Sequence, residues 1–193
     1  GSRAGHLALV MNEDEIRAFA QERDLHTAAR KALADEEAQV LVLKRGVRGA
    51  LIFEGERDPH PVPAYRSSTV FKIGTGDVFS AWFAHLWAER GVSAAEAADG
   101  ASRAVAAYVQ SRTLPPPEVD LAALVIGDRP GRVRLEGNPN TLGQRFVLEE
   151  TRYILRQIRL VVDSPGLCDL PTRWEAADAT IILEPGSAGV VDS

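Results

Sequence analysis

The stretch Gly74-Thr75-Gly76-Asp77-Val78-Phe79 places two glycines and an acid directly before an apolar helical pattern. Over residues 75–90 the pattern repeats at the i, i+3, i+4 and i+7 positions of one helix face, occupied by Phe79, Trp82, Phe83 and Leu86. This spacing predicts a buried helix. The unpaired N–H groups of its first turn and its dipole favour an anion, and glycines let the backbone approach a phosphate closely. We therefore expect an anion site at Gly74, Thr75 and Gly76.

Asp77 is the candidate for acid–base chemistry at this turn. A carboxylate beside an anion site can accept the proton of an attacking hydroxyl during phosphoryl transfer. The alternative for the same stretch is a plain helix N-terminus, where the dipole alone favours the acid.

Two short apolar runs, Val40–Leu43 and Ala50–Phe53, are predicted to form a β-hairpin. The connection between them is Lys44-Arg45-Gly46-Val47-Arg48-Gly49, whose two glycines suit a tight turn with positive φ. Arg45 and Arg48 are expected to be solvated at this turn or to reach a nucleotide.

The rest of the first part of the chain is predicted to be largely helical. Charged residues alternate with apolar ones at helical spacing over 13–34, and an alanine-rich helix is predicted over 94–110. A polar loop is expected up to Pro63. The helix over 94–110 must end before Leu114-Pro115-Pro116-Pro117, because proline cannot continue a helix. We therefore predict a unit at 1–113 and a proline-rich linker at 114–131.

A second unit is predicted at 132–193, with alternating strands and helices that indicate a parallel sheet covered on its faces. The expected elements are strands at 133–135, 160–162 and 180–183 and helices at 141–157 and 172–177. The longer helix is expected to turn Leu142, Phe146, Tyr153 and Ile154 inward.

The first unit resembles the PfkB family of ribokinase-like carbohydrate kinases. Gly74 to Asp77 resembles the family's Gly-Ala-Gly-Asp signature, and Asn12-Glu13-Asp14-Glu15, after the apolar run Leu7–Met11, resembles its strand-end Asn-x-x-Glu. The hairpin resembles the strand pair whose glycine turn lies beside the nucleotide, and Ala97–Ala107 resembles the alanine-rich helix near adenine. The resemblance covers residues 7 to about 112 and implies an α/β fold, a Rossmann-type sheet with flanking helices.

This resemblance implies a phosphotransferase that moves the γ-phosphoryl group of ATP, with Mg²⁺, to a hydroxyl of a sugar or nucleoside. Asp77 would be the catalytic base, and Asn12 and Glu15 would act on the Mg²⁺–phosphate network. The implied ATP-binding residues are Gly74, Thr75, Gly76, Lys72, Lys44, Gly46, Gly49 and Ser102.

Two departures from the family pattern bear on function. Phe71 and Lys72 stand where the family usually has Asp-Thr, so Lys72 is expected either to meet the phosphates or to be solvated. In the family the sugar-binding half precedes the Asn-x-x-Glu strand, whereas this sequence starts near that strand. We therefore expect a fragment that does not bind sugar productively by itself.

The second unit resembles nucleoside 2-deoxyribosyltransferase-like domains. Residues 132–146 resemble their opening strand, loop and helix, and residues 178–186 resemble a later strand and turn. Val190 stands where that family has its nucleophilic Glu, and Asp192 is a possible substitute at the end of the chain. The resemblance implies a shortened, catalytically silent Rossmann-like module.

Composition limits the remaining functions. A formal net charge of −5 argues against nucleic-acid binding, and no apolar run reaches the roughly 20 residues that cross a membrane. The single cysteine, Cys168, favours a reducing cytoplasm. Homo-oligomers remain possible. The alternatives to a kinase are a non-catalytic nucleotide-binding or scaffold protein and a deoxyribosyltransferase-like N-glycoside enzyme. The histidines lack zinc-ligand spacing.

Overall fold

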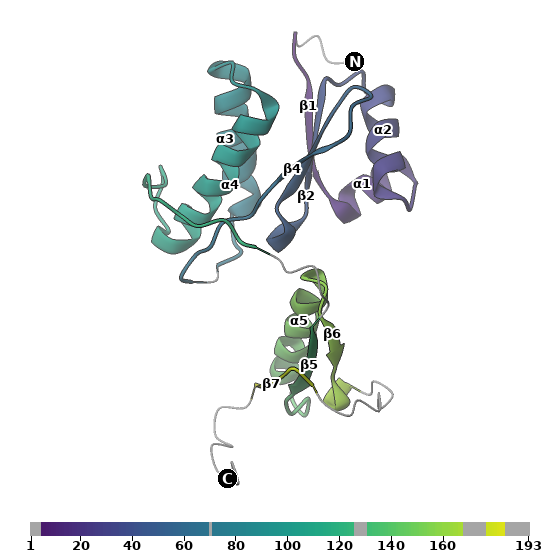
Figure 1. The fold of residues 1–193 in the computed structure, drawn as a ribbon, viewed down its shortest axis with the longest axis vertical. Coiled ribbons are helices and arrows are strands. Elements are labelled where there is room, and N and C mark those ends of the chain that lie inside the picture. Colours follow the sequence, from purple (N-terminus) through teal and green to yellow (C-terminus); the bar gives the residue numbers. More distant parts are fainter. Residues whose placement is uncertain (1–4, 70, 126–130, 168–176, 184–193) are drawn as a thin grey trace. The chain divides into compact units, whose positions relative to one another are not determined.

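The computed structural model describes residues 5–69, 71–125, 131–167 and 177–183, and the chain divides into two compact units, Gly1–Val125 and Ile126–Ser193 (Figure 1). Part of the proline-bearing segment pairs with the first unit: Tyr65 and Ala123 form a β-bridge, and the Leu124 N–H donates to the Ala64 carbonyl at 2.7 Å. Residues 123 and 124, within the predicted linker, therefore pack on the first unit. None of the helices in the described part of the chain is long and apolar enough to span a membrane.

A four-stranded mixed sheet forms the centre of the first unit. Its strands are β1 (Ala8–Asn12), β2 (Val40–Lys44), β3 (Ala50–Glu54) and β4 (His60–Val62), and they lie in that order. β1 runs parallel to β2, and β2 and β3 form the predicted antiparallel hairpin. β4 pairs with β3 within the stretch that we predicted as loop, and its edge position tolerates a proline.

One face of the sheet is covered by two helices, α1 (Glu13–Ala20) and α2 (Leu25–Asp35) (Figure 1). The helical prediction over 13–34 is confirmed except at residues 21–24, where the chain breaks between the two helices. The chain leaves α1 at Gln21, which has a left-handed φ of 53°, and α2 starts anew at Asp24, whose side chain caps the Thr27 N–H. Ile16 of α1 packs against the buried strand residues on this face.

The opposite face is covered by α3 (Thr75–Ala84), a π-helical turn at His85–Glu89 and α4 (Ala94–Ser111). Phe79 and Phe83 are buried against the sheet, so the apolar face predicted for this helix is confirmed. The small residues of α4 allow close packing, because a Cβ added at Gly100 would lie 2.5 Å from the Leu86 side chain.

The second unit contains a parallel sheet in the order β6 (Val161–Asp163), β5 (Arg132–Glu136) and β7 (Ala179–Ile182). The predicted parallel pairing is therefore confirmed. The remaining described elements are α5 (Leu142–Gln157) and a 3-10 turn at Pro165–Leu167. All but the last residue of the helix expected at 172–177, the end of the strand and turn expected at 178–186, and the positions of Val190 and Asp192 lie outside the described residues.

Of the four residues predicted to face inward from α5, Ile154 is partly buried and the other three are wrong. Leu142, Phe146 and Tyr153 are exposed, whereas Leu148 is buried and Leu155 packs beside it. Leu148 and Leu155 lie seven residues apart, on one side of the helix, and this side faces a small sheet. The exposed apolar residues lie on other parts of the helix circumference.

Candidate functional site

A cavity of about 230 Å³ lies in the first unit, where four segments meet. These are the β2–β3 turn, the chain after β4, the first turns of α3 and the middle of α4. The lining residues are Lys44, Gly46, Gly49, Ala64, Tyr65, Ser67, Thr75, Gly76, Phe79, Ser102, Val105, Ala106 and Val109.

The cavity brings together residues that are far apart in the sequence and were predicted to bind one ligand. Those in its wall are Lys44, Gly46, Gly49, Thr75, Gly76 and Ser102. The remaining predicted residues, which do not line it, are Asn12, Glu15, Lys72, Gly74 and Asp77. The cavity therefore gathers six of the eight predicted ATP-binding residues, without Lys72 and Gly74, and none of the predicted base and metal-network residues.

The β2–β3 turn needs its glycines for two different reasons. Gly46 and Gly49 have positive φ values of 58° and 75°, as the hairpin prediction required. In addition, a Cβ at Gly49 would lie only 2.0 Å from the Val62 carbonyl oxygen. The turn therefore lies directly against the end of β4, and only glycine permits this contact.

Lys44 ends β2 and projects toward the start of α3. Its Nζ lies 3.5 Å from the position that a Cβ on Gly76 would occupy, so the ammonium group faces the first helical turn across the cavity. A cation and a helix N-terminus both attract negative charge. The space between them suits an anion.

The start of α3 has no capping side chain. Gly74 stands at the N-cap with a left-handed φ of 75° and makes no side-chain hydrogen bond to the first turn. Among the described helices, α1, α4 and α5 each begin with a complete capping box. The first N–H groups of α3 are thus left without such a cap. Asp77 lies in the same turn and is exposed.

The α4 side of the cavity is mainly apolar. Val105, Ala106 and Val109 line it, and the Ser102 hydroxyl is engaged, because it donates to the Pro63 carbonyl at 2.7 Å. A flat apolar ring fits such a wall better than a charged group does. The cavity as a whole suits a molecule with a ring at one end and an anionic group at the other.

Tyr65 also lines the cavity, although it was not predicted as a site residue. Its hydroxyl and ring contact two side chains of α4. Its hydroxyl donates to Asp99 Oδ1 at 2.5 Å, Arg103 Nε donates to Asp99 Oδ2 at 2.9 Å, and the Arg103 guanidinium lies 4.2 Å from the Tyr65 ring centroid. Desolvation and then the hydrogen bond to Asp99 raise the pKa of Tyr65 to about 12. The Asp99–Arg103 spacing was visible in the sequence, but nothing there linked it to Tyr65.

Phe71, which departs from the family pattern, packs at the C-terminal end of α4. Its ring lies edge-on to Tyr108 with the centroids 6.0 Å apart, and the Arg112 guanidinium lies 4.9 Å from its centroid. Tyr108 also contacts the Gly74 region, because a Cβ at Gly74 would lie 3.1 Å from the Tyr108 hydroxyl oxygen. These contacts hold the loop before α3. Lys72, in the same loop, is exposed, and its carbonyl accepts the Thr75 hydroxyl at 3.0 Å.

Asn12 and Glu15 form the capping box of α1. Asn12 Oδ1 accepts the N–H groups of Asp14 and Glu15 at 2.9 and 2.8 Å, and Glu15 Oε2 accepts the Asn12 N–H at 2.7 Å. Both residues therefore stabilise the start of α1 by capping it. The described residues contain no group of three histidine, cysteine or acidic side chains that could hold a metal.

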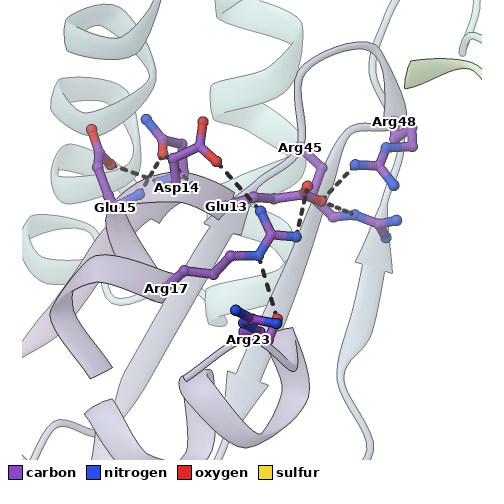
Figure 2. A network of polar contacts seen from close by, with 8 residues as sticks. Glu13, Asp14, Glu15, Arg17, Arg23, Arg45 and Arg48 are labelled. Atoms are coloured by element: carbon purple, nitrogen blue, oxygen red, sulfur yellow. Dashed lines mark hydrogen bonds and ion pairs between the residues drawn. The ribbon is translucent and has the colours of Figure 1, made fainter. Parts of the chain in front are cut away.

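Arg45 and Arg48 pair with Glu13 (Figure 2), and neither lines the cavity. The prediction that they are solvated is wrong, since their side chains are only 19% and 21% exposed. Glu13 follows Asn12 directly, so β1, α1 and the hairpin turn meet at this ion-pair cluster.

Comparison with protein families gives one match. The model of the pfkB family carbohydrate kinases matches residues 6–117. The matched region contains every predicted site residue and ends before the second unit, so it does not support the deoxyribosyltransferase-like resemblance. No curated protein matches the chain.

Solved structures similar to the chain include three kinases. A probable sugar kinase from Rhizobium etli CFN 42 is 24% identical, with a TM-score of 0.48 over 54% of this chain and 31% of that one. Ribokinase from Thermotoga maritima is 24% identical, with a TM-score of 0.47 over 56% and 37%. A nucleoside kinase from Burkholderia thailandensis, in complex with inosine, is 22% identical, with a TM-score of 0.45 over 56% and 34%. The chain thus spans between 31% and 37% of the length of these proteins.

Proposed function

Since the chain belongs to the pfkB family of carbohydrate kinases, whose model matches more than half of it, we propose that it carries the ATP-binding part of a kinase. The proposed reaction transfers the γ-phosphoryl group of ATP to a hydroxyl of a sugar or nucleoside. Membership of the family supports the reaction class. Because the chain spans only 31% of the length of the probable sugar kinase, the acceptor is part of the proposal.

One observation carries this proposal: the cavity combines a cationic, N–H-rich end with an apolar side. Lys44 and the uncapped first turn of α3 supply the anion-attracting end, and Val105, Ala106 and Val109 supply the apolar side. A nucleoside triphosphate has the matching order of ring and phosphates. In the proposed complex the phosphates lie at Lys44 and Gly76, with the base against α4.

Asp77 is the proposed catalytic base. It lies one residue beyond Gly76 and is exposed, so an acceptor hydroxyl in front of the helix can approach it. As the acceptor oxygen forms its bond to the γ-phosphorus, its proton passes to the Asp77 carboxylate and the bond to ADP breaks. Lys44 and the helix N-terminus then stabilise the negative charge of the transferred group.

Kinases of this family use ATP with a divalent metal ion, and we propose Mg²⁺ here. Mg²⁺ usually binds one or two carboxylates together with waters and substrate phosphates, so a dedicated cluster of protein ligands is not required. Glu15 fits an indirect role, because one of its oxygens caps α1 while its side chain is exposed. Metal bound with the nucleotide would neutralise phosphate charge.

For residues 132–193 the parallel order β6-β5-β7 supports a Rossmann-like module. We propose no catalytic activity for it. The positions on which a deoxyribosyltransferase-like activity would depend lie outside the described residues.

The test is calorimetric titration of the chain with the non-hydrolysable ATP analogue AMP-PNP and Mg²⁺. We expect wild type to bind, Asp77→Asn to bind with similar affinity, and Gly76→Val to lose binding by about 100-fold or more, because the valine side chain enters the space facing Lys44. Asp77→Asn should abolish phosphoryl transfer wherever an acceptor is turned over.

Gly143→Val is the matched control for the glycine change. Gly143 occupies the second position of α5, as Gly76 does in α3, and a Cβ there meets no atom within 4 Å. The control should leave nucleotide affinity unchanged. Absence of AMP-PNP binding by the wild-type chain would contradict the proposal. If the chain binds AMP-PNP but a full-length protein that contains it phosphorylates no acceptor, a non-catalytic nucleotide-binding protein would be favoured.

A further inference from the structure

Glu13 connects the first turn of α1 to the glycine turn of the cavity. Its Oε1 accepts from Arg48 Nη2 at 2.6 Å and from Arg45 Nε at 3.2 Å (Figure 2). Its other oxygen, Oε2, lies 3.8 Å from Arg17 Nη2. One carboxylate therefore binds both arginines of the β2–β3 turn, while Gly46 and Gly49 of the same turn line the cavity.

Strand geometry explains why Lys44 and Arg45 have different partners. Side chains alternate between the two faces of a strand, and in β2 Val40 and Val42 face α3 and α4, whereas Leu41 and Leu43 face α1 and α2. Lys44 continues the first series and reaches the cavity. Arg45 follows on the other face, where Glu13 lies. The turn is thus held from the side opposite to its ligand-facing side.

The position of Glu13 is itself fixed. It is the first residue of α1, and the capping box of Asn12 and Glu15 orders that turn from both sides. β1 and β2 are in parallel register with Asn12 opposite Lys44, so the sheet sets the start of α1 beside the start of the glycine turn. The Glu13 side chain is only 16% exposed, which lowers the solvent screening of its ion pairs.

We propose that Glu13 is a positioning residue for nucleotide binding, acting through Arg45 and Arg48 on the Gly46–Gly49 turn without touching the nucleotide. This inference rests on the proposed function, because it assigns an additional determinant to the same cavity. Without the carboxylate, two cationic side chains that converge on one oxygen would repel each other. The turn would then lose its fixed path along the cavity.

The sign of the effect separates positioning from long-range electrostatics. ATP is a polyanion, so removing a negative charge near its site strengthens binding if charge alone acts. Removing a positioning contact weakens binding, because the turn must be ordered when the nucleotide enters. Glu13→Gln keeps the shape of the side chain and removes its charge, so it tests the two effects in opposite directions.

The experiment is titration of the 193-residue chain with AMP-PNP and Mg²⁺, comparing wild type, Glu13→Gln and Asp14→Asn. We expect Glu13→Gln to weaken binding about tenfold. Asp14→Asn is the matched control, because it removes a carboxylate from the same helical turn but one that is exposed and pairs only with Arg17 among the described ion pairs. Its affinity should stay within about twofold of wild type.

A double-mutant cycle with Arg48→Met tests whether the effect passes through the arginine. Arg48→Met alone should also weaken binding, and Glu13→Gln with Arg48→Met should be little worse than Glu13→Gln alone, since Glu13→Gln already removes the contact with Arg48. Additive losses would contradict the proposed route. Should Glu13→Gln lower the melting temperature too far for titration, Glu13→Asp replaces it: this change keeps the charge and shortens the side chain, so positioning predicts weaker binding and charge alone predicts no change.

The outcomes distinguish the positioning role of Glu13 from the nucleotide binding on which it depends. If wild type binds and Glu13→Gln binds as well or more tightly, the positioning role is wrong and the proposed function stands. If wild type does not bind, the proposed function is wrong, and the inference with it. Amide hydrogen exchange of residues 46–49 in the nucleotide-free chain should be faster in Glu13→Gln than in Asp14→Asn, and equal rates would also overturn the positioning role.

Discussion

The starts of α1 and α3 use the N–H groups of a first helical turn in opposite ways. Both helices cover the same sheet, and both carry an acid in the first turn. In α1, Asn12 and Glu15 accept and return hydrogen bonds within the turn, so the turn is closed by its own side chains. In α3, Gly74 has no side chain to offer, and the turn opens toward Lys44.

The difference teaches what a glycine at a helix start can mean. A capped start gains stability from its own polar groups. An uncapped start beside a cation lacks that stabilisation, and its backbone N–H groups are available to bind an anionic ligand. We infer that α1 contributes to the site mainly by fixing Glu13, whereas α3 contributes its backbone directly.

Removing the cation should break this comparison most strongly. Lys44→Met keeps the length of the side chain and removes its charge, so we expect AMP-PNP affinity to fall by roughly 10- to 100-fold, the value of a hydrogen bond to a charged group. Calorimetric titration with Mg²⁺ measures the change.

Lys31→Met is the control for the lysine change. Lys31 Nζ donates to the Ala20 carbonyl at 2.8 Å and connects α2 to α1, away from the cavity. Lys31→Met should lower the melting temperature and leave nucleotide affinity unchanged. Equal affinity losses in the two variants would show that Lys44 acts through stability and not through the ligand.

Removing the cap of α1 should produce a smaller effect, on stability. Asn12→Ala deprives the Asp14 and Glu15 N–H groups of their acceptor, and we expect a loss of about 1 kcal/mol in the free energy of unfolding. Urea unfolding measures it. Asn12→Asp, whose carboxylate accepts the same bonds, should retain wild-type stability.

Thr141→Ala makes the same change at the capping box of α5 and should cost a similar amount. Because Thr141 lies in the other unit, its effect on nucleotide affinity should be nil. A large loss of affinity in Asn12→Ala without a loss of stability would show that α1 is open to the ligand as well, and would support the predicted metal-network role of Asn12.

Local patterns were enough to predict the parts of this site that depend on backbone conformation. The glycines of the β2–β3 turn and the start of α3 were found because positive φ and a helix start have short sequence signatures. The break at Gln21 was missed, because its left-handed residue is not a glycine and helical periodicity runs through it. β4 was missed because three residues containing a proline form a strand only by pairing with β3.

Contacts between distant segments were beyond the reach of a single sequence. Tyr65 meets Asp99 across 34 positions, and Tyr108 meets the Ile73 carbonyl across 35. No periodicity connects such pairs, since the sheet and α4 bring them together. The pairing of Glu13 with Arg45 and Arg48 escaped prediction for the same reason, although all three residues lie beside motifs that were recognised.

The smallest expected effect concerns Tyr65. Its hydroxyl donates to Asp99 within the protein, just as the N–H groups of the first turn of α1 donate to Asn12. Tyr65→Phe should lower the free energy of unfolding by about 0.5 kcal/mol at neutral pH, because Asp99 keeps its bond to Arg103. The pKa of Tyr65 is raised from 10.0 to about 12. Its neutral form is therefore favoured in the folded state, and this stability is fully present below pH 10 and lost as the pH rises toward 12.

The stability advantage of wild type over Tyr65→Phe should consequently shrink above pH 10 and reverse before pH 12, because phenylalanine has no group to ionise. Urea unfolding at pH 8, 10 and 11 measures the difference, with Tyr153→Phe as control, because Tyr153 is exposed on α5. A constant difference across this range would mean that burial and the hydrogen bond to Asp99 do not raise the pKa of Tyr65. The polar network of the wall would then be open to a ligand, and the contrast between closed and open groups would end at α3.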